Sequence, residues 1–360
     1  MTALQRAILW ARRVSPKKAP SLAEKRILVV LITGMGDLTL AVPAIRAIRQ
    51  STPSGGLDLL TSEKGRRAAE GCPYIDTIES IDLNPSPEQG VHPSADMGKF
   101  LPLLRKVHRR YDIAINLMGL YSPQGAVRMG LFLRFLGVST IAGRNTLGTG
   151  TFYHCAITED LAVPRNERDT HLDLVRHLGA DNGAGAELET WPTADDERSA
   201  ESLHNNLHGQ GPVIVLNPGT VRQEKNWPEE RFLEVMRTVR TDKEARFLLT
   251  GGPAEADLTE RLADSVAPYA LNTVGKISYQ GTAVLMKRCD MVLTSDTEAL
   301  HLAWAAGAAG VTLFIKENLG RYRPATEKII CLVGEDTGEE ISLEISVDEV
   351  TMACLECLDR

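Results

Sequence analysis

The sequence predicts an α/β protein with two halves, each built on a parallel sheet that helices cover. Short apolar runs rich in β-branched residues alternate with helical patterns, as the strands of parallel sheets alternate with their crossover helices. A linker-like stretch near residues 181–212 interrupts the alternation, which then restarts. The length of 360 residues suits two domains of ordinary size. We therefore expect a ligand cleft between the two halves.

The first half opens with a strand predicted at residues 27–32, which read ILVVLI. Such a continuous apolar run is typical of a strand buried on both faces of a sheet. A helical pattern follows at 38–49, and the residues TPSGG stop it. Further strands are expected at 57–62, 74–83 and 113–119, helices at 63–71, 100–112 and 125–136, and a loop at 84–98.

The second half opens with a helix at 196–208 and a strand at 213–217, which reads VIVLN. The next helix, at 228–240, has Pro228 in its first turn with glutamates beside it, a typical helix start. Further strands are expected at 245–252, 291–296 and 310–315, and further helices at 254–266, 282–290 and 298–307.

The composition is that of a soluble globular protein, with 43% hydrophobic and 24% charged residues. No stretch of about 18 residues is apolar throughout, so we expect no membrane-spanning helix, and no signal peptide is visible. The net charge of −7 argues against nucleic acid as a partner. Six scattered cysteines indicate a reducing compartment and no disulfide framework.

Two of these cysteines, Cys354 and Cys357, form a CxxC pair, but no second pair offers metal-ligand spacing. Val350, Cys354 and Leu358 recur at helical spacing, with Val347 one turn before them. We therefore interpret these cysteines as small core residues of a C-terminal helix, not as metal ligands.

The N-terminus has a distinct charge pattern. Residues 1–23 include five basic side chains and no acidic one. On a helical wheel Leu4 and Ile8 share one face, while Arg6 and Arg13 lie opposite. A basic amphipathic segment of this kind can lie on an anionic membrane surface. A solvated extension, or a helix docked on the body of the protein, explains the pattern equally well.

Four turns after predicted strands can carry chemistry, because open α/β sheets bind ligands at the carboxyl ends of their strands. The first is Gly34-Met35-Gly36-Asp37, where glycines allow close approach of a ligand. Asp37 is either a helix cap or a general base.

The second turn, NPGTVRQEKNWPEERF at 217–232, contains Gly219, Thr220 and Lys225. A hydroxyl and an ammonium at a helix start suit a phosphate, although a solvated loop lysine is the plainer alternative.

In the third turn, Gly251 and Gly252 end a strand and Glu255 follows in the first turn of a helix. Glu255 either complements the helix dipole or accepts hydrogen bonds from ribose hydroxyls. In the fourth turn, Ser295-Asp296-Thr297 forms an N-cap cluster. His301 lies on the helix that follows, where a packing role is the common alternative to a ligand contact.

In their order and spacing, these segments resemble the heptosyltransferase family of glycosyltransferases over roughly residues 26–350. The most specific blocks are KNWPEERF and DTEALHLA, which follow a strand–GMGD–helix start. The resemblance also rests on ILVVLITGMGDLTLAVPAIRAIR, YIDTIESIDL, YDIAINLMGLYS, VIVLNPGTVRQEKNWPEERF, LLTGGPAEADLTERLA and DMVLTSDTEALHLAWAAG. It implies a GT-B fold, in which two Rossmann-like domains face each other across a deep cleft. It also implies inverting, metal-independent sugar transfer from a nucleotide-diphospho-sugar.

On this basis we divide the chain into four parts. A basic amphipathic extension covers 1–25, an N-terminal Rossmann-like acceptor domain 26–190, a C-terminal Rossmann-like donor domain 191–340, and a C-terminal helix 341–360.

The resemblance also implies roles for individual residues. Asp37 matches the family's catalytic base. Lys225 matches the lysine that contacts the donor diphosphate, and Thr220 lies in the same loop. Glu255 matches the acidic residue that holds the ribose. Asp296 and Thr297 match the Asp-Thr/Ser pair of the donor site, and His301 matches the histidine that follows it. The glycine turns are those of Gly34, Gly36, Gly219, Gly251 and Gly252.

The chain departs from the family pattern in two places. Glu298 stands where the family commonly has glycine, and a second carboxylate there would repel a diphosphate unless it turns away or pairs with a cation. The stretch after VTLF reads IKENLGRYRPAT, where the family commonly begins Gly-Pro-Thr. Lys316, Arg321 and Arg323 could restore positive charge there.

The sequence thus predicts a glycosyltransferase without a cofactor or metal, with ADP-heptose as the leading donor. The expected acceptor is a cell-envelope glycan or glycolipid such as lipopolysaccharide core. Arg128 and Arg144 are candidate contacts for an anionic acceptor, with solvated surface arginines as the alternative. We expect a cytoplasmic monomer that can sit peripherally on the inner face of the membrane.

Two other hypotheses remain open from the sequence. A degenerate family member would bind nucleotide or glycan without catalysis, with Glu298 as the defect. A nicotinamide-dependent oxidoreductase is weaker, because GMGDLT has Thr39 where the GxGxxG motif needs its last glycine.

Overall fold

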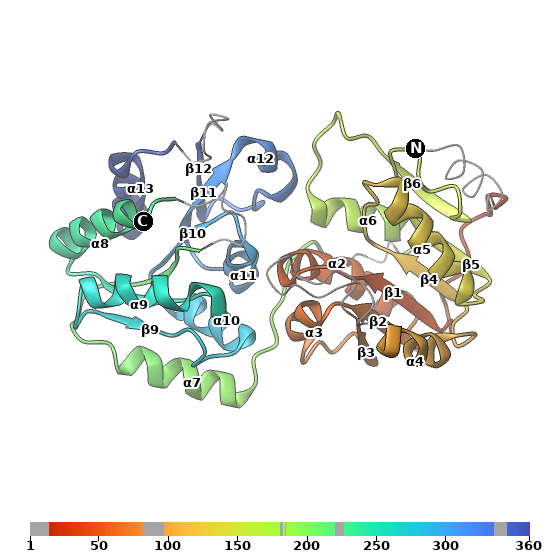
Figure 1. The fold of residues 1–360 in the computed structure, drawn as a ribbon, viewed down its shortest axis with the longest axis horizontal. Coiled ribbons are helices and arrows are strands. Elements are labelled where there is room, and N and C mark those ends of the chain that lie inside the picture. The colour runs from red at the N-terminus through yellow and green to blue at the C-terminus, as the bar shows by residue number, and fades with distance from the viewer. Residues whose placement is uncertain (1–13, 82–96, 181–182, 184, 220–226, 335–343) are drawn as a thin grey trace. The chain divides into compact units, whose positions relative to one another are not determined.

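The protein is described here from a computed structural model that covers residues 14–81, 97–180, 183, 185–219, 227–334 and 344–360. The chain divides into two compact units, Met1–Glu187 and Leu188–Arg360. Each unit is a parallel sheet with helices on its faces (Figure 1). The two-unit α/β fold predicted from the sequence is therefore confirmed. In the described residues no helix is both long and apolar enough to cross a membrane.

The sheet of the first unit has the strand order β3-β2-β1-β4-β5-β6. All its strands pair in parallel, and β1 lies between β2 and β4. The strands are β1 (Ile27–Leu31), β2 (Leu57–Thr61), β3 (Thr77–Ser80), β4 (Ile113–Asn116), β5 (Thr140–Thr146) and β6 (Cys155–Glu159).

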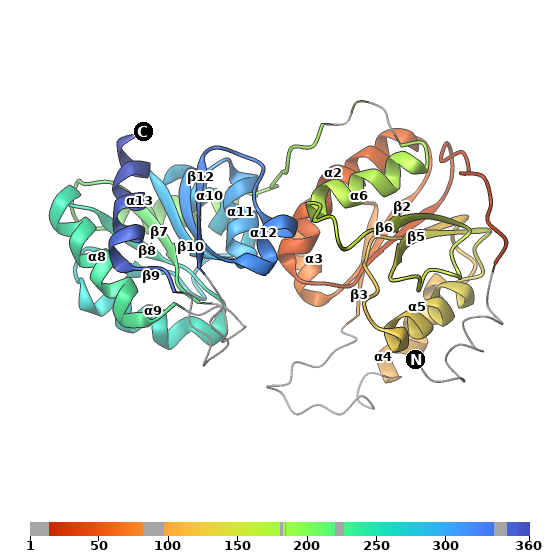
Figure 2. The ribbon, with the colours of Figure 1, turned by 90° about the horizontal axis from the view of Figure 1, so that it is seen from above.

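Helices cover both faces of this sheet. They are α2 (Met35–Ser51), α3 (Glu63–Ala69), α4 (Met97–Val107), α5 (Pro123–Phe135) and α6 (Glu167–His177). Figure 2 shows α2 and α6 above the sheet and α4 and α5 below it. On the α4–α5 side, Val107 and Leu133 pack against Leu28 and Val30 of β1, which alternate with residues that point to the other face.

The second unit repeats the arrangement with the strand order β12-β11-β10-β7-β8-β9, again all parallel. Its strands are β7 (Val213–Asn217), β8 (Arg246–Leu249), β9 (Ala270–Asn272), β10 (Met291–Ser295), β11 (Gly310–Ile315) and β12 (Ile329–Gly334). Its helices are α7 (Ala194–Asn205), α8 (Glu229–Lys243), the 3-10 turn η3 (Pro253–Glu255), α9 (Ala256–Ser265), α10 (Tyr279–Arg288), α11 (Glu298–Ala306), α12 (Lys316–Tyr322) and α13 (Val347–Asp359).

Alternate residues of each strand serve two cores in this unit. Ile214 and Leu216 of β7 face the core formed with α8, α9 and α13. Val213 and Val215 face the opposite core, formed with α7, α10 and α11. The KNWPEERF block contributes to the first core through Trp227, whose Nε1 donates to the carbonyl oxygen of Ile345 at 3.0 Å.

The C-terminal cysteines belong to that core as well. Cys354 and Cys357 lie buried on α13 beside Val350. Burial raises the pKa of both thiols above the ordinary value. The interpretation of the CxxC pair as core residues is therefore confirmed.

Three parts of the first unit were missed by the sequence patterns: β5, β6 and α6. β5 reads TIAGRNT, which mixes polar and apolar residues, yet it is buried along nearly its whole length. Residues 1–13 of the predicted basic amphipathic extension at 1–25, and most of the predicted loop at 84–98, lie outside the described residues. The described continuation of the N-terminus lies along β6, since the Lys17 N–H donates to the carbonyl oxygen of His154 at 2.8 Å.

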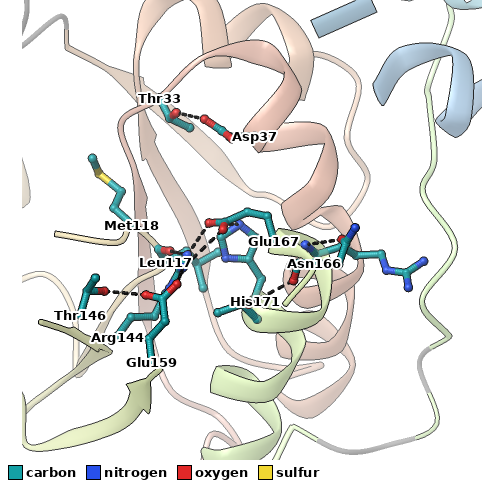
Figure 3. A network of polar contacts seen from close by, with 12 residues as sticks. Thr33, Asp37, Leu117, Met118, Arg144, Thr146, Glu159, Asn166, Glu167 and His171 are labelled. Atoms are coloured by element: carbon teal, nitrogen blue, oxygen red, sulfur yellow. Dashed lines mark hydrogen bonds and ion pairs between the residues drawn. The ribbon is translucent and has the colours of Figure 1, made fainter. Parts of the chain in front are cut away.

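The missed strands matter because Arg144 lies on β5. Its side chain is fully buried and is held by Glu159 of β6 and Glu167 of α6, as Figure 3 shows. Arg144 also donates to the carbonyl oxygen of Leu117 at 3.1 Å. The expectation that Arg144 is solvated, or available to an anionic acceptor, is therefore wrong. A guanidinium between two carboxylates inside the sheet is a structural element.

Burial alone would lower the pKa of Arg144, but Glu167 and Glu159 outweigh burial and raise it. Arg144 therefore stays charged. His171 lies in the same cluster, with its Nε2 at 3.6 Å from a carboxylate oxygen of Glu167. This cluster ties α6 to β5 and β6, which the sheet hydrogen bonds join only to each other.

We predict that Glu167→Ala lowers the free energy of unfolding of the first unit by about 3 kcal/mol, because it leaves a buried guanidinium with one partner fewer. Urea denaturation followed by circular dichroism measures this. Asp173→Ala is the matched control, since it removes a carboxylate on the same helix whose partner, Arg165, is exposed. We expect that change to cost less than about 1 kcal/mol. Equal effects of the two variants would contradict a structural role for the buried cluster.

Candidate functional site

The first candidate site lies where β1 gives way to α2. Gly34 is the N-cap of α2 and has no side-chain cap, so Asp37 is not the capping residue. Asp37 lies in the first turn instead, where the hydroxyl of Thr33 donates to its Oδ2 (Figure 3). The half-buried carboxylate of Asp37 is thus placed at the carboxyl edge of the sheet. A carboxylate in this position can accept a proton.

Thr33 is itself fixed from the neighbouring strand. The hydroxyl of Ser62, the N-cap residue of α3, donates to the carbonyl oxygen of Thr33. The same hydroxyl accepts the Gly65 N–H at 2.9 Å. A Cβ at Gly65 would lie only 2.0 Å from Oγ1 of Thr61, so glycine is required for α3 to start this close to β2. The loop that carries Thr33 is therefore held at the start of α2, which follows it, and by the start of α3.

The second candidate site is the carboxyl edge of the sheet in the other unit. Asn217, the last residue of β7, donates through Nδ2 to the carbonyl oxygen of Thr250 at 3.0 Å. Thr297 approaches from the far side of β7, its Oγ1 at 3.5 Å from Oδ1 of Asn217. Residues after β7, β8 and β10 are therefore in contact around one buried amide.

The side chain of Glu255 stabilises the turn after β8 by a hydrogen bond within it. Its Oε2 accepts the Gly252 N–H at 2.7 Å, and the side chain packs tightly against two glycines. A Cβ at Gly219 would lie 2.1 Å from Cγ of Glu255, and one at Gly251 would lie 2.9 Å from its Cβ. The glycines after β7 and β8 are therefore needed to admit this carboxylate. The helix-start role of Glu255 is confirmed, and its ribose contact stays a prediction.

The start of α11 also lies at this edge of the sheet. Thr297 is the N-cap residue, and its hydroxyl accepts the Ala299 N–H at 3.3 Å, which confirms the predicted cap. Asp296 is buried and accepts a hydrogen bond from Nδ2 of Asn318. Glu298 is the first residue of α11 and is half-buried. Its carboxylate therefore belongs to the positive end of the helix dipole.

His301 lies one turn further along α11. Its side chain is buried, and its ring lies tilted against that of Tyr322 of α12, with the ring centroids 5.9 Å apart. The unusual stretch after β11 thus forms α12, which brings Asn318 to Asp296 and Tyr322 to His301. Arg321 lies over the Tyr322 ring at 5.7 Å, whereas Lys316 is exposed.

Besides the buried Arg144, three predicted site residues are not among those described at the two edges. Thr220 and Lys225 lie outside the described residues. Arg128 is exposed on α5, as the solvated alternative expects, and a contact to an acceptor stays a prediction. In the described residues no three His, Cys, Asp or Glu side chains are grouped as metal ligands would be.

Four contributors to the two sites were missed from the sequence: Thr33, Asn217, Thr250 and Asn318. Thr33 and Asn217 carry a positional signal, because each lies at the end of a predicted strand beside a glycine turn. Asn318 carries none, since it reaches Asp296 from 22 residues away through the packing of α12.

Three comparisons agree on what the chain is similar to. The family model for Glycosyltransferase family 9 (heptosyltransferase) matches residues 101–349. A curated relative, lipopolysaccharide heptosyltransferase 3 of Escherichia coli, is 20% identical over 308 residues, which cover 82% of this chain and 85% of the relative.

Solved structures share the fold. The glycosyltransferase family 9 protein of Veillonella parvula has a TM-score of 0.77 and 21% identity, with 95% of this chain and 99% of that chain covered. The E. coli heptosyltransferase WaaC with ADP has a TM-score of 0.67 and 20% identity, with 92% and 99% covered. The residues that match the family model make up more than half of the chain. This chain therefore belongs to glycosyltransferase family 9, the heptosyltransferase family, and is a glycosyltransferase.

Proposed function

We propose that the protein transfers heptose from ADP-heptose to a lipopolysaccharide-core acceptor, by an inverting reaction that needs no metal ion. The observation that carries the proposal is the placement of Asp37. Asp37, which matches the family's catalytic base by resemblance, lies at a sheet edge in the first turn of α2, where the Thr33 hydroxyl holds its carboxylate. Similarity to lipopolysaccharide heptosyltransferases and to a structure solved with ADP supports the choice of donor and acceptor.

In this mechanism Asp37 accepts the proton of an acceptor hydroxyl as its oxygen attacks the anomeric carbon of the donor sugar. The bond between that carbon and the diphosphate oxygen breaks on the opposite face, and its electron pair leaves with the nucleoside diphosphate. Amides at the N-terminus of α11, together with Lys225, stabilise the charge that builds on the diphosphate. The products are the glycosylated acceptor and ADP.

The donor lies at the carboxyl edge of β7, β8 and β10, with its diphosphate toward Thr297 and its ribose toward Glu255. Gly219 and Gly251 leave room for Glu255 there, because a Cβ at either position would clash with it. Glu298 stands beside the same helix start, so its charge opposes the diphosphate unless the side chain turns away. The direction of the Glu298 side chain therefore distinguishes a catalytic protein from the alternative, a family member that binds nucleotide or glycan without catalysis.

The remaining expectations concern the setting of the reaction. We propose that the protein acts as a cytoplasmic monomer, with acceptor contacts from the first unit. The basic segment at residues 1–23 supports a peripheral contact with an anionic membrane.

We predict that ADP raises the melting temperature more than UDP, GDP, CMP or NAD, without a divalent metal. A ligand at a hundred times its Kd adds about 2.7 kcal/mol of stability, which thermal-shift fluorimetry detects.

We predict that Glu255→Gln raises the Kd of the protein for ADP about tenfold. The amide still accepts the Gly252 N–H, but the negative charge that would accept hydrogen bonds from the ribose hydroxyls is lost. Glu234→Gln, an exposed carboxylate on α8, is the matched control.

Stabilisation by NAD alone would instead support an oxidoreductase. If no nucleotide stabilises the protein at millimolar concentration, the proposed donor site is wrong, and Glu298→Gly becomes the variant that tests the non-catalytic alternative.

We predict that Asp37→Asn lowers kcat for sugar transfer by roughly 10²–10⁴-fold, because the amide cannot accept the proton. Stabilisation by ADP should be unchanged, since the donor contacts come from the other unit. Glu63→Gln is the control, because Glu63 lies at the equivalent first turn of α3 after β2. Near-intact transfer by Asp37→Asn would refute the mechanism.

We predict that Thr33→Val lowers kcat about tenfold with little change in KM, because a hydrogen bond to a charged group is lost and the carboxylate is no longer held. Thr33→Ser keeps the hydroxyl and should restore kcat. A purely structural role for Thr33 would give equal activities for the two variants after correction for folded protein.

A further inference from the structure

The outer face of α5 carries two large apolar side chains that stay partly exposed in the described structure. Leu131 and Phe135 lie one turn apart on this helix and are 41% and 47% exposed. Its inner face is fully used, since Ala126, Met129 and Leu133 are buried against the sheet. Leu131 and Phe135 therefore take no part in the packing of α5 against the sheet.

Positive charge surrounds this pair. Arg128 and Arg134 are exposed on the same helix. From Met97 to Thr158 the sequence contains one acidic residue, Asp112, although the chain as a whole has a net charge of −7. The carboxylate of Asp112 accepts the Arg26 N–H at 2.9 Å, and so it is engaged at the base of the sheet.

Neighbouring elements extend the same surface. The ring of His108, just after α4, lies at 4.9 Å from that of Phe135, and the Arg109 N–H donates to the carbonyl oxygen of Leu136 at 2.7 Å. Figures 1 and 2 both show α4 and α5 adjacent. The end of α4 thus adds exposed Arg105 and Arg109.

On the other side of α5 the N-terminal segment adds Lys17. Burial lowers the pKa of His154, and the charges of Lys17 and Arg134 lower it further, so these two cations lie near one imidazole. The helix face therefore combines apolar side chains with cations from three segments.

From this juxtaposition we infer that the outer face of α5, with Leu131 and Phe135 at its centre, docks the protein on an anionic phospholipid membrane. Apolar side chains reach the acyl boundary while the surrounding arginines meet lipid phosphates. A soluble protein partner of equal charge complementarity would have to be acidic and apolar at once, whereas an anionic bilayer offers both features at one surface. The inference is independent of which sugar the protein transfers.

The test is flotation of the full-length protein with vesicles of phosphatidylethanolamine and phosphatidylglycerol, and with neutral phosphatidylcholine vesicles. We expect binding to the anionic vesicles that weakens as salt rises. Leu131→Gln/Phe135→Gln should lower the partition coefficient about tenfold or more, because two apolar side chains no longer insert. Arg134→Gln should lower it roughly fivefold at low salt.

Met352→Gln is the matched control, since Met352 is 63% exposed on α13 of the other unit. It should bind as the unchanged protein does. Arg6→Gln/Arg12→Gln/Arg13→Gln removes charge from the N-terminal segment, and the loss caused by Leu131→Gln/Phe135→Gln should persist in that background.

Equal binding by Leu131→Gln/Phe135→Gln and the unchanged protein would overturn the inference. So would a dimer in sedimentation that this double variant alone dissociates, because the face would then bind a second copy of the chain. Neither readout depends on transferase activity, so the docking face and the proposed function can fail separately. Melting temperature and ADP stabilisation report whether each variant is folded.

Discussion

In a parallel sheet all strands run the same way, so every strand ends at one edge and every following helix begins there. This constraint acts in each unit of the protein and gathers residues that are far apart in the chain. In the second unit it brings Asn217, Thr250 and Thr297 into contact, although they follow three different strands. In the first it places Asp37 beside the loop that Ser62 holds. The positive ends of the helices come to the same edge, which makes that edge suited to an anionic ligand.

The two edges differ in what they can do. At the first edge a carboxylate is held by a hydroxyl at a fixed point, which is suited to accepting a proton. At the second, glycines make room for Glu255, and a helix begins at Thr297, an arrangement suited to binding a nucleoside diphosphate. The proposed division between a catalytic base in one unit and a donor site in the other is based on this difference. It also explains why variants at the two edges are expected to separate turnover from nucleotide binding.

Charged side chains occur in three different settings in the first unit: inside the sheet, at the sheet edge and on the outer face of α5. The buried guanidinium of Arg144 joins two strands and a helix, and its charge is matched by Glu159 and Glu167. The carboxylate of Asp37 accepts a hydrogen bond from Thr33 at the sheet edge and is the base in the proposed mechanism. The exposed arginines of α5 have few acidic neighbours in sequence, and they surround an apolar pair. An enzyme whose acceptor is anchored in a membrane gains from such a surface, because docking shortens the search for that acceptor.

The sequence by itself determined the alternation of strands and helices, the two halves and the glycine turns, because buried parallel strands must be apolar and strand ends must turn. It also determined that Cys354 and Cys357 are core residues, since their helical spacing with Val350 leaves no other face. Only the tertiary structure decided the place of Arg144. An arginine in a polar strand such as TIAGRNT reads as exposed until the carboxylates of β6 and α6 are seen to enclose it. The contact between Asn318 and Asp296 was likewise set by the packing of α12, because no local pattern encodes which distant side chain will reach a buried carboxylate.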